Sequence, residues 1–353
     1  MNALTTGSLL VALAGAAHAQ EPAPDRDLQE IAPGVFAALQ PDERRFDDAN
    51  SMIVVTYRDV LVVDTPTDPA RTQRIHQQVD RFERPVRWLV NTHWHSDHVS
   101  TNALWKNRYE QLLVVGHESL REDFAGRTRP SITEQVERLQ AQIPAAREAL
   151  AAGRGLGGQE LDPEQQQAQR RAIDAAGSLL DRLRETKVED PDVTYSERLV
   201  LHRDSGNIEL LHFRGHTRGD TVVWLPRQRV LATGDLLDEL PFGGHGYPSS
   251  WLAALETLRE LEPRLVVPGH GPVQTGTARL ELAIELWQTL IDHYGAAHDR
   301  GESFEDATEA LDLSDLRDRF CAGDETAERN WRGFTPASQR RVWQEVRGEI
   351  AGG

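Results

Sequence analysis

Cysteine and long apolar runs are both scarce in this chain of 353 residues, which contains one cysteine. Cys321 has no second cysteine to pair with, so no disulfide can form within the chain. It lies in a polar C-terminal region, and we interpret it as a packing residue rather than a nucleophile. A membrane-spanning helix needs about 20 consecutive apolar residues. Because no stretch reaches that length, we expect no membrane span.

Basic residues are fewer than acidic residues in this chain. Lys and Arg number 39 against 56 Asp and Glu, which gives a formal net charge of −17. A protein of this charge repels phosphate backbones, so nucleic acid is an unfavourable substrate and we expect none as a partner. Solubility is the simplest explanation of the acidity. Hydrophobic residues, at 39%, are sufficient for the core of a large globular protein.

The N-terminus has the features of a secretory signal, although it lacks the usual basic residues. The short apolar stretch Leu9–Ala17 leads into Ala17-His18-Ala19, the small-x-small pattern after which signal peptidases cut. We therefore predict a signal peptide at residues 1–19, cleaved after Ala19, and a secreted or periplasmic protein. Because no Lys or Arg precedes the apolar stretch, an uncleaved, disordered N-terminus is the alternative.

Strand-like and helix-like segments alternate along residues 20–353, which predicts an α/β fold in a single domain. Residues 118–191 predict a helical insertion, either a solvated hairpin or a cap over an active site, and residues 273–353 a helical C-terminal extension. Strands are expected at 35–38, 52–57, 60–63, 86–90, 112–115, 198–202, 208–213, 221–225, 230–232 and 265–267, and helices at 70–82, 132–152, 163–187, 250–261, 279–297 and 336–350.

A dense group of potential metal ligands occurs in His93-Trp94-His95-Ser96-Asp97-His98, directly after the strand expected at 86–90. Two His separated by one residue in an extended turn can both point at one ion, and the Asp and His that follow can reach a second. Imidazole and carboxylate are donors that zinc prefers. The chain has only 13 His, so composition alone rarely produces such a segment.

Three further segments each follow an expected strand and place glycine beside a potential ligand. They are Gly215-His216, Gly234-Asp235 and Gly269-His270. Glycine permits the backbone turn that aims a side chain away from a strand end. Taken singly, each His is an ordinary loop residue and the Asp a turn former, but their joint occurrence favours a metal site.

In order, spacing and strand context, these four segments resemble the motifs of the metallo-β-lactamase superfamily over about residues 30–275. The resemblance implies a four-layer αββα sandwich with two zinc ions at one edge, between the two sheets. The superfamily's ligand positions, matched motif by motif to this chain, imply three ligands for each zinc and one bridging residue. These are His93, His95 and His216 for the first zinc, Asp97, His98 and His270 for the second, and Asp235 as the bridge.

The chemistry that this resemblance implies is hydrolysis. Coordination to zinc lowers the pKa of water far below its usual value, to about 7, which makes a hydroxide available near neutral pH. Asp97 is expected to orient this hydroxide, as a catalytic residue, as well as to bind metal. Asp64, at a strand end, is expected either to accept a hydrogen bond from a ligand His or simply to end the strand.

The residue at position 235 narrows the substrate class. One lactamase subclass has cysteine there and another has serine, whereas a bridging Asp resembles glyoxalase II-like thioesterases, lactonases and phosphodiesterases. Export and a compact zinc site favour a small acyl substrate: a lactone, ester, thioester or β-lactam, of which Asp235 makes the β-lactam the least favoured. The alternative is an enzyme similar to the persulfide dioxygenases, which use a single iron on the same fold. The complete ligand set favours two metals and hydrolysis.

The glycine-rich loop after Asp235 is expected to shape the substrate pocket. His245 and Tyr247 in this loop could donate a hydrogen bond to an oxyanion near the zinc, or they are incidental members of a connector. Trp94, inside the first motif, would either line the pocket or pack beside it.

Overall fold

The structure, a computed structural model, describes residues 27–350, and the predicted signal peptide lies outside this part of the chain. Contacts divide the chain into two compact units. The larger unit comprises Asp27–Phe124 and Glu189–Gly353, and the described part of the smaller unit is Ala125–Val188. The smaller unit contains most of the predicted helical insertion.

The first sheet of the larger unit has seven strands. They are β1 Gln29–Ala32, β2 Val35–Ala38, β3 Ser51–Val55, β4 Val60–Val63, β5 Val86–Val90, β6 Leu113–His117 and β7 Val193–Tyr195, in that spatial order. β1 to β4 pair antiparallel, and β4 to β7 pair parallel. Parallel neighbours need a crossover, which α2 (Pro69–Asp80) provides between β4 and β5 and α3 (Asn102–Arg108) between β5 and β6.

The second sheet has six strands in the spatial order β13-β12-β11-β10-β9-β8. They are β8 Arg198–Leu201, β9 Ile208–Phe213, β10 Asp220–Leu225, β11 Val230–Gly234, β12 Leu265–Pro268 and β13 Gln274–Thr275. Helix α7 (Pro248–Glu260) connects the parallel pair β11 and β12, and the other neighbours are antiparallel. This order brings the carboxyl ends of β11 and β12 to one edge of the sheet.

The two sheets pack face to face because alternate residues of their strands are apolar on the inner face. In β10, Val223 packs between the sheets whereas its neighbour Val222 packs against the helices outside. The core between the sheets contains Val35, Ala37, Met52, Val54, Leu61, Val63, Val90 and Val115 from the first sheet, and Leu210, Val223, Leu225, Val230, Ala232 and Val267 from the second.

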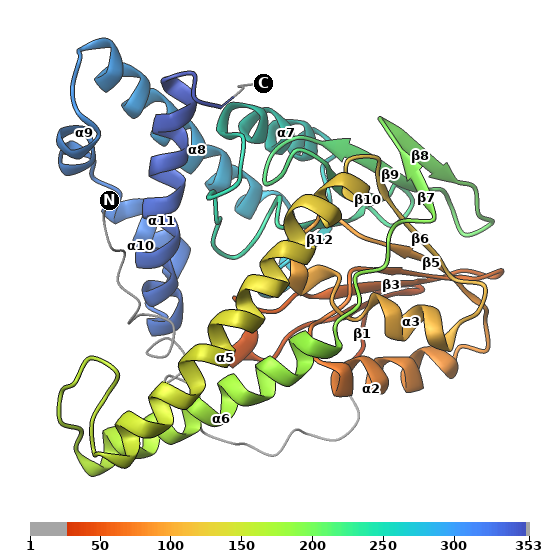
Figure 1. The fold of residues 1–353 in the computed structure, drawn as a ribbon. Helices are drawn as coiled ribbons and strands as arrows, with labels where there is room; N and C mark the ends of the chain where they lie inside the picture. Colours follow the sequence, from red (N-terminus) through yellow and green to blue (C-terminus); the bar gives the residue numbers. More distant parts are fainter. Residues whose placement is uncertain (1–26, 351–353) are drawn as a thin grey trace. The chain divides into compact units, whose positions relative to one another are not determined.

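Helices cover the outer faces of both sheets (Figure 1), so the larger unit is the expected four-layer αββα sandwich. Ile75 and Val79 of α2 and Trp105 of α3 pack on the first sheet. On the second sheet, α7 and α8 (Ala278–Asp299) bring Trp251 and Trp287 together, with ring centroids 4.6 Å apart.

The C-terminal extension is helical, as predicted, but its last helix is longer than expected. We expected a helix from about Pro336, whereas this proline lies in the interior of α11 (Glu325–Val346). Asp324 caps α11 by accepting a hydrogen bond from the Ala327 N–H, so the helix begins well before the proline. The remaining short helices are η2 Asp42–Arg44, η3 Ser96–His98, α4 Leu120–Asp123, η4 Phe124–Thr128, α9 Phe304–Ala310 and α10 Ser314–Cys321.

The smaller unit is a hairpin of two long helices, α5 (Arg129–Ala151) and α6 (Pro163–Glu185), which lie side by side in Figure 1. These are the two helices predicted for the insertion. They bury a common apolar stripe, and Asp162 and Gln165 form a capping box at the start of α6. The buried residues are Ile132, Leu139, Ile143, Ala146, Ala172, Ile173, Ala176, Leu180 and Leu183.

The structure bears on two expectations from the sequence: that Cys321 is a packing residue, and that the chain has no membrane span. Cys321 is buried in the apolar layer outside the second sheet, and burial raises the pKa of its thiol to about 11, which suits a packing residue. Within residues 27–350, no helix is long and apolar enough to cross a membrane.

Trp287→Ala is expected to lower the free energy of unfolding of the larger unit by about 3–5 kcal/mol, because it leaves a cavity beside Trp251 in a fully buried layer. Urea unfolding followed by tryptophan fluorescence measures this, since all eight tryptophans lie in the larger unit. Tyr57→Ala is the control, because that side chain is 76% exposed and its loss should change the unfolding free energy by under about 0.5 kcal/mol. Equal effects of the two substitutions would contradict this packing.

Candidate metal centre

The potential ligands all lie in loops at one end of the strands. Because β4, β5 and β6 are parallel and β11 and β12 are parallel, their carboxyl ends meet at this edge. His93, His95, Asp97 and His98 follow β5, His216 precedes β10, Asp235 follows β11 and His270 follows β12. The structure therefore brings all the sequence-predicted ligands into two adjoining groups.

Two glycines allow the loops to approach this closely. Gly234 has φ +51, and a Cβ there would lie 2.4 Å from Thr92 Oγ1. At Gly269 a Cβ would lie 2.1 Å from Asp235 Oδ1. Any side chain at either position would push the ligand loops apart, so glycine is required here.

The first group consists of three imidazoles and one carboxylate oxygen. His95 Nδ1 and His216 Nε2 are 3.0 Å apart. The Oδ2 atom of Asp235 lies 3.4 Å from His216 Nε2, 3.5 Å from His93 Nε2 and 4.0 Å from His95 Nδ1. Four donor atoms thus converge on one point.

The second group is built around the other oxygen of the same carboxylate. The Oδ1 atom of Asp235 lies 2.9 Å from His98 Nε2 and 3.5 Å from His270 Nε2. Asp97 Oδ2 closes the group, at 3.4 Å from His98 Nε2 and 3.1 Å from His270 Nε2. Asp235 therefore presents one oxygen to each group.

Both groups fit a metal ion of the size and preference of zinc. Bonds of about 2.0–2.2 Å in a tetrahedron place neighbouring donor atoms roughly 3.3–3.6 Å apart, close to the distances between these donors. Within residues 27–350, His93 Nε2 and His98 Nε2 are buried and form no hydrogen bond of acceptable geometry. A buried polar nitrogen without a partner is costly, and a metal ion would satisfy both.

The buried histidines of the first donor group differ in charge from those of the second. Burial lowers the pKa of His93 and His216 well below the usual value, which keeps both rings neutral and able to donate a lone pair. At His98 and His270 burial acts in the same direction, but the carboxylates around them, chiefly that of Asp235, outweigh it and raise the pKa. The carboxyl pKa of Asp235 is correspondingly lowered, because the imidazolium charges overcome the effect of burial, so it is ionised.

Asp64 accepts a hydrogen bond from His98, one of the predicted metal ligands, in agreement with the first of the two interpretations given to it. Its Oδ2 is 2.7 Å from His98 Nδ1, and it also accepts hydrogen bonds from Thr92 N (2.8 Å) and Thr92 Oγ1 (2.6 Å). Asp64 is buried and has φ +55, a conformation that Asp and Asn tolerate better than most residues. By holding the proton on Nδ1 of His98, it directs Nε2 toward the second group.

The two loop residues predicted to contact substrate lie in different surroundings. His245 is exposed, and its Nδ1 lies 3.0 Å from His95 Nε2. The ring of Trp94 packs against His95 at 4.2 Å, so this tryptophan packs beside the ligands. The ring of Tyr247 instead lies under the guanidinium of Arg214 at 3.9 Å. A role in substrate binding remains a prediction for both His245 and Tyr247.

Two residues that the sequence analysis did not identify hold the His270 loop in place by hydrogen bonds. Asn50 Nδ2 donates hydrogen bonds to the carbonyls of Pro268 (3.0 Å) and Gly271 (2.8 Å), on either side of His270. Asp238 accepts a hydrogen bond from His270 N at 2.8 Å, and burial together with the charge of Asp235 raises its carboxyl pKa well above the usual value. The spacing Asp235-Leu236-Leu237-Asp238 was a visible signal for Asp238, whereas nothing in the sequence around Asn50 pointed to it.

Comparisons with known proteins point to the same superfamily. A family model described as the metallo-beta-lactamase superfamily matches residues 44–270, the segment that carries every ligand motif. Two relatives named metallo-beta-lactamase type 2, from Bacillus sp. (strain 170) and Bacillus cereus, are each 34% identical to this chain over 84 residues. Each match covers 21% of this chain and 33% of the relative, so the chain spans about a third of the length of these relatives.

Solved structures share the fold at low sequence identity. A metallo-beta-lactamase family protein from Thermus thermophilus is 18% identical, with a TM-score of 0.57 and coverage of 91% of this chain and 95% of that one. The DIM-1 metallo-beta-lactamase is 18% identical, with a TM-score of 0.50 and coverage of 74% and 96%. Since the family model matches more than half of its length, this chain belongs to the metallo-β-lactamase superfamily. Membership supports a metal-dependent hydrolase in general terms.

Asp64→Asn is expected to weaken zinc binding by about 10–100-fold, because an amide N–H would face the donor groups of His98 or Thr92 and disturb the ring orientation. Asparagine tolerates the positive φ at this position, so the fold should survive. Competition with a coloured chelator gives the affinity. Asp299→Asn, at a side chain that is 87% exposed, is the control. Unchanged affinity in Asp64→Asn would show that the hydrogen bond to His98 does not support metal binding.

Proposed function

We propose that this protein is a hydrolase that uses two zinc ions to cleave a small acyl substrate. The observation that carries the proposal is the position of Asp235, whose two oxygens face two separate groups of donors. His93, His95 and His216 would complete the first site, and Asp97, His98 and His270 the second. Zinc bound there would supply a water of pKa about 7 and polarise the substrate carbonyl.

Asp97 is the residue that we propose to act on the reacting water. Its side chain is 24% exposed, whereas those of His93, His98 and His216 are almost fully buried. Burial disfavours the charged form, but the surrounding His98 and His270 outweigh it and lower the carboxyl pKa of Asp97, so the group is ionised and can accept a hydrogen bond from water at a carboxylate oxygen. An ionised carboxylate at the open side of the site suits a group that orients water.

Substrate would approach from the side of Asp97 and His95, the most exposed of the ligand side chains. The His95 side chain is 14% exposed, and His245 and Trp94 lie against it. We propose that His245 contributes to the rim of the pocket and can donate a hydrogen bond to a substrate oxygen. Tyr247 would contribute through its hydroxyl, while its ring stays packed against the guanidinium of Arg214.

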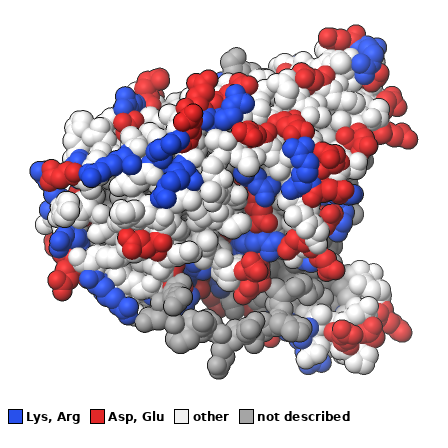
Figure 2. Space-filling view, turned by 180° about the vertical axis from the view of Figure 1, so that it is seen from behind, with Lys and Arg blue, Asp and Glu red and all other residues white. Residues whose placement is uncertain are grey.

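The candidate substrates are lactones, esters, thioesters and β-lactams. The bridging carboxylate of Asp235 favours the first three, since the two lactamase subclasses compared above have cysteine or serine at this position. The matched Bacillus relatives carry the name metallo-beta-lactamase, which keeps β-lactams in the panel. Polymeric nucleic acid is disfavoured by the net charge of −17, and on the face seen in Figure 2 basic and acidic side chains are interspersed without a continuous basic surface.

The sequence also supports the proposal that the protein is exported. The pattern Ala17-His18-Ala19 after an apolar stretch is typical of a cleaved signal peptide. Outside the cell or in the periplasm, a small acyl compound is a more suitable substrate than a cytosolic thioester of glutathione. Determination of the mature N-terminus tests cleavage after Ala19.

The zinc-loaded protein is expected to hydrolyse at least one member of a panel containing a lactone, an aryl ester, a thioester, a chromogenic cephalosporin and an aryl phosphodiester. The expected kcat/KM is about 10⁴ M⁻¹s⁻¹ or more, the low end for ordinary enzymes. Asp97→Ala should lower this value by at least about 100-fold, because it removes a proposed ligand together with the carboxylate that orients the reacting water. Asp299→Ala, at an exposed side chain, should leave it unchanged.

Inactivity across the whole panel, combined with one bound iron per chain, would reject the hydrolase and favour an oxygenase of the persulfide-dioxygenase kind. Hydrolysis of the cephalosporin alone would assign the enzyme to β-lactam cleavage despite the aspartate at position 235. Hydrolysis that persists in Asp97→Ala would remove Asp97 from the proposed mechanism.

A further inference from the structure

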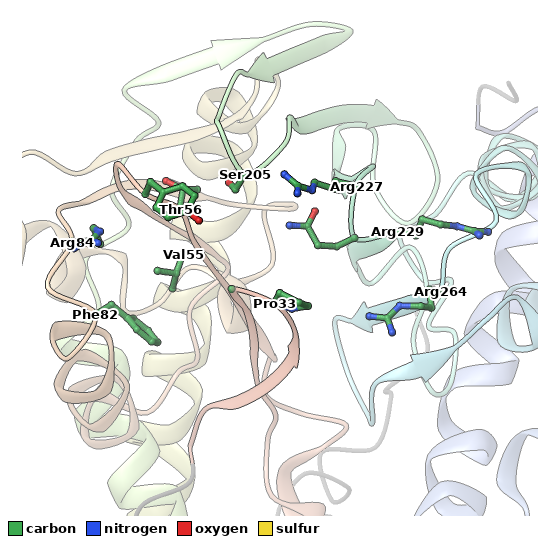
Figure 3. Close-up of a pocket in the computed structure, with 12 residues that line it drawn as sticks. Pro33, Val55, Thr56, Phe82, Arg84, Ser205, Arg227, Arg229 and Arg264 are labelled. Carbon is green, nitrogen blue, oxygen red and sulfur yellow. The ribbon is translucent and has the colours of Figure 1, made fainter.

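A pocket lies at the opposite ends of the strands from the candidate metal centre, and Figure 3 shows the residues that line it. It is lined by the turns that join β1 to β2, β3 to β4, β8 to β9 and β10 to β11, together with the segments that precede β5 and β12. All of these segments belong to the larger unit. Its volume of about 720 Å³ lies within the range of ~300–1,000 Å³ that is usual for small-molecule sites.

The lining of this pocket is basic in a strongly acidic protein. Four of its 12 residues are arginines and none is acidic, although the chain carries a net charge of −17. Arg227 and Arg229 come from the turn between β10 and β11, Arg84 from the segment before β5, and Arg264 from the segment before β12. Arginines from three separate segments therefore gather around one cavity, where their mutual repulsion favours binding of an anion.

Two of these guanidinium groups are available for a ligand. Arg229 is engaged with Glu262, with an ion pair of 3.2 Å and a hydrogen bond of 2.8 Å to the Glu262 carbonyl, and Figure 3 shows its side chain directed away from the pocket. The side chains of Arg227 and Arg264 form no ion pair or hydrogen bond with any other residue in 27–350. In Figure 3, Arg227 extends toward Ser205 and Arg264 toward Pro33.

The wall opposite these arginines combines apolar side chains with Thr56 and Arg84. Figure 3 shows Val55 and Phe82 across the pocket from Arg227 and Arg264. Tyr57 also lines the pocket and is 76% exposed, an unusual degree of exposure for a large aromatic side chain. Exposed aromatic and apolar surface beside basic groups suits a ligand that combines a flat ring with negative charge.

We propose that this pocket binds a small organic phosphate with at least two negative charges next to a flat ring, the chemistry of a nucleoside diphosphate. Arg227 and Arg264 would each donate paired N–H groups to phosphate oxygens, a geometry for which guanidinium is suited. The ring would lie against Phe82 and Tyr57. This site is independent of the reaction at the metal centre, because it lies at the other end of the strands.

The test is isothermal titration of the zinc-loaded full chain with ADP at about 0.15 M salt, where unspecific charge attraction is largely screened. We expect a Kd below about 1 mM for ADP, weaker binding of pyrophosphate, which lacks the ring, and no binding of adenosine, which lacks the charge. Arg227→Gln and Arg264→Gln should each weaken ADP binding by at least about tenfold, since each removes charged hydrogen bonds.

Arg229→Gln is the matched control, because it removes the same charge from the same turn at a guanidinium already engaged with Glu262. Binding in this variant should stay within about twofold of the unmodified protein. Unchanged tryptophan-fluorescence unfolding midpoints would show that the substitutions leave the fold intact.

Three results would overturn the proposal. The first is the absence of ADP binding. The second is ADP binding that Arg227→Gln and Arg264→Gln leave unchanged, which would place the nucleotide at the metal centre. The third is tighter binding of citrate than of ADP, which would assign the pocket to carboxylates without a ring. None of these results bears on the hydrolysis panel, so failure here is distinguishable from failure of the proposed hydrolase.

Discussion

The carboxylate of Asp235 is the group on which the rest of the candidate metal centre depends. It is 6% exposed, and its two oxygens each complete a different set of donors. A buried carboxylate is costly unless it is matched by charge or metal, so its position constrains every loop around it. Gly269 permits the approach of the His270 loop, and Asn50 fixes the backbone on both sides of His270. A hydrogen bond of 2.7 Å from Thr221 N to Thr92 O links the two sheets at the same edge.

Much of this architecture could be predicted from the sequence, because the predicted metal ligands lie next to the ends of predicted strands. His93 to His98, His216, Asp235 and His270 each adjoin a strong β-branched strand, so strand prediction and ligand prediction supported one another. The short elements β1, β7 and α3 were missed because a few residues carry too little periodicity to be recognised. The early start of α11 could not be predicted in this way, because a proline often marks a helix boundary, whereas the Asp324 cap starts this helix well before Pro336.

Contacts between segments far apart in the sequence could not be predicted in the same way. The Asn50 side chain donates hydrogen bonds to the carbonyls of Pro268 and Gly271, more than 200 residues along the chain, and these bonds exist only once the two sheets have packed. The arginine-lined pocket is similar, because Arg84, Arg227 and Arg264 are separate residues in an otherwise acidic sequence. The same strands that deliver ligands to one edge deliver these arginines to the other. One scaffold thus provides two chemically different ends, one suited to metal ions and one to anions.

Zinc titration of the metal-free protein, with a chelating indicator reporting free metal, tests the central claim most directly. If Asp235 bridges two sites, the protein binds two equivalents of zinc per chain before free metal accumulates. Binding of a single equivalent, or a purified protein that carries one iron per chain and takes up no zinc, would contradict the arrangement of two sites that share one carboxylate.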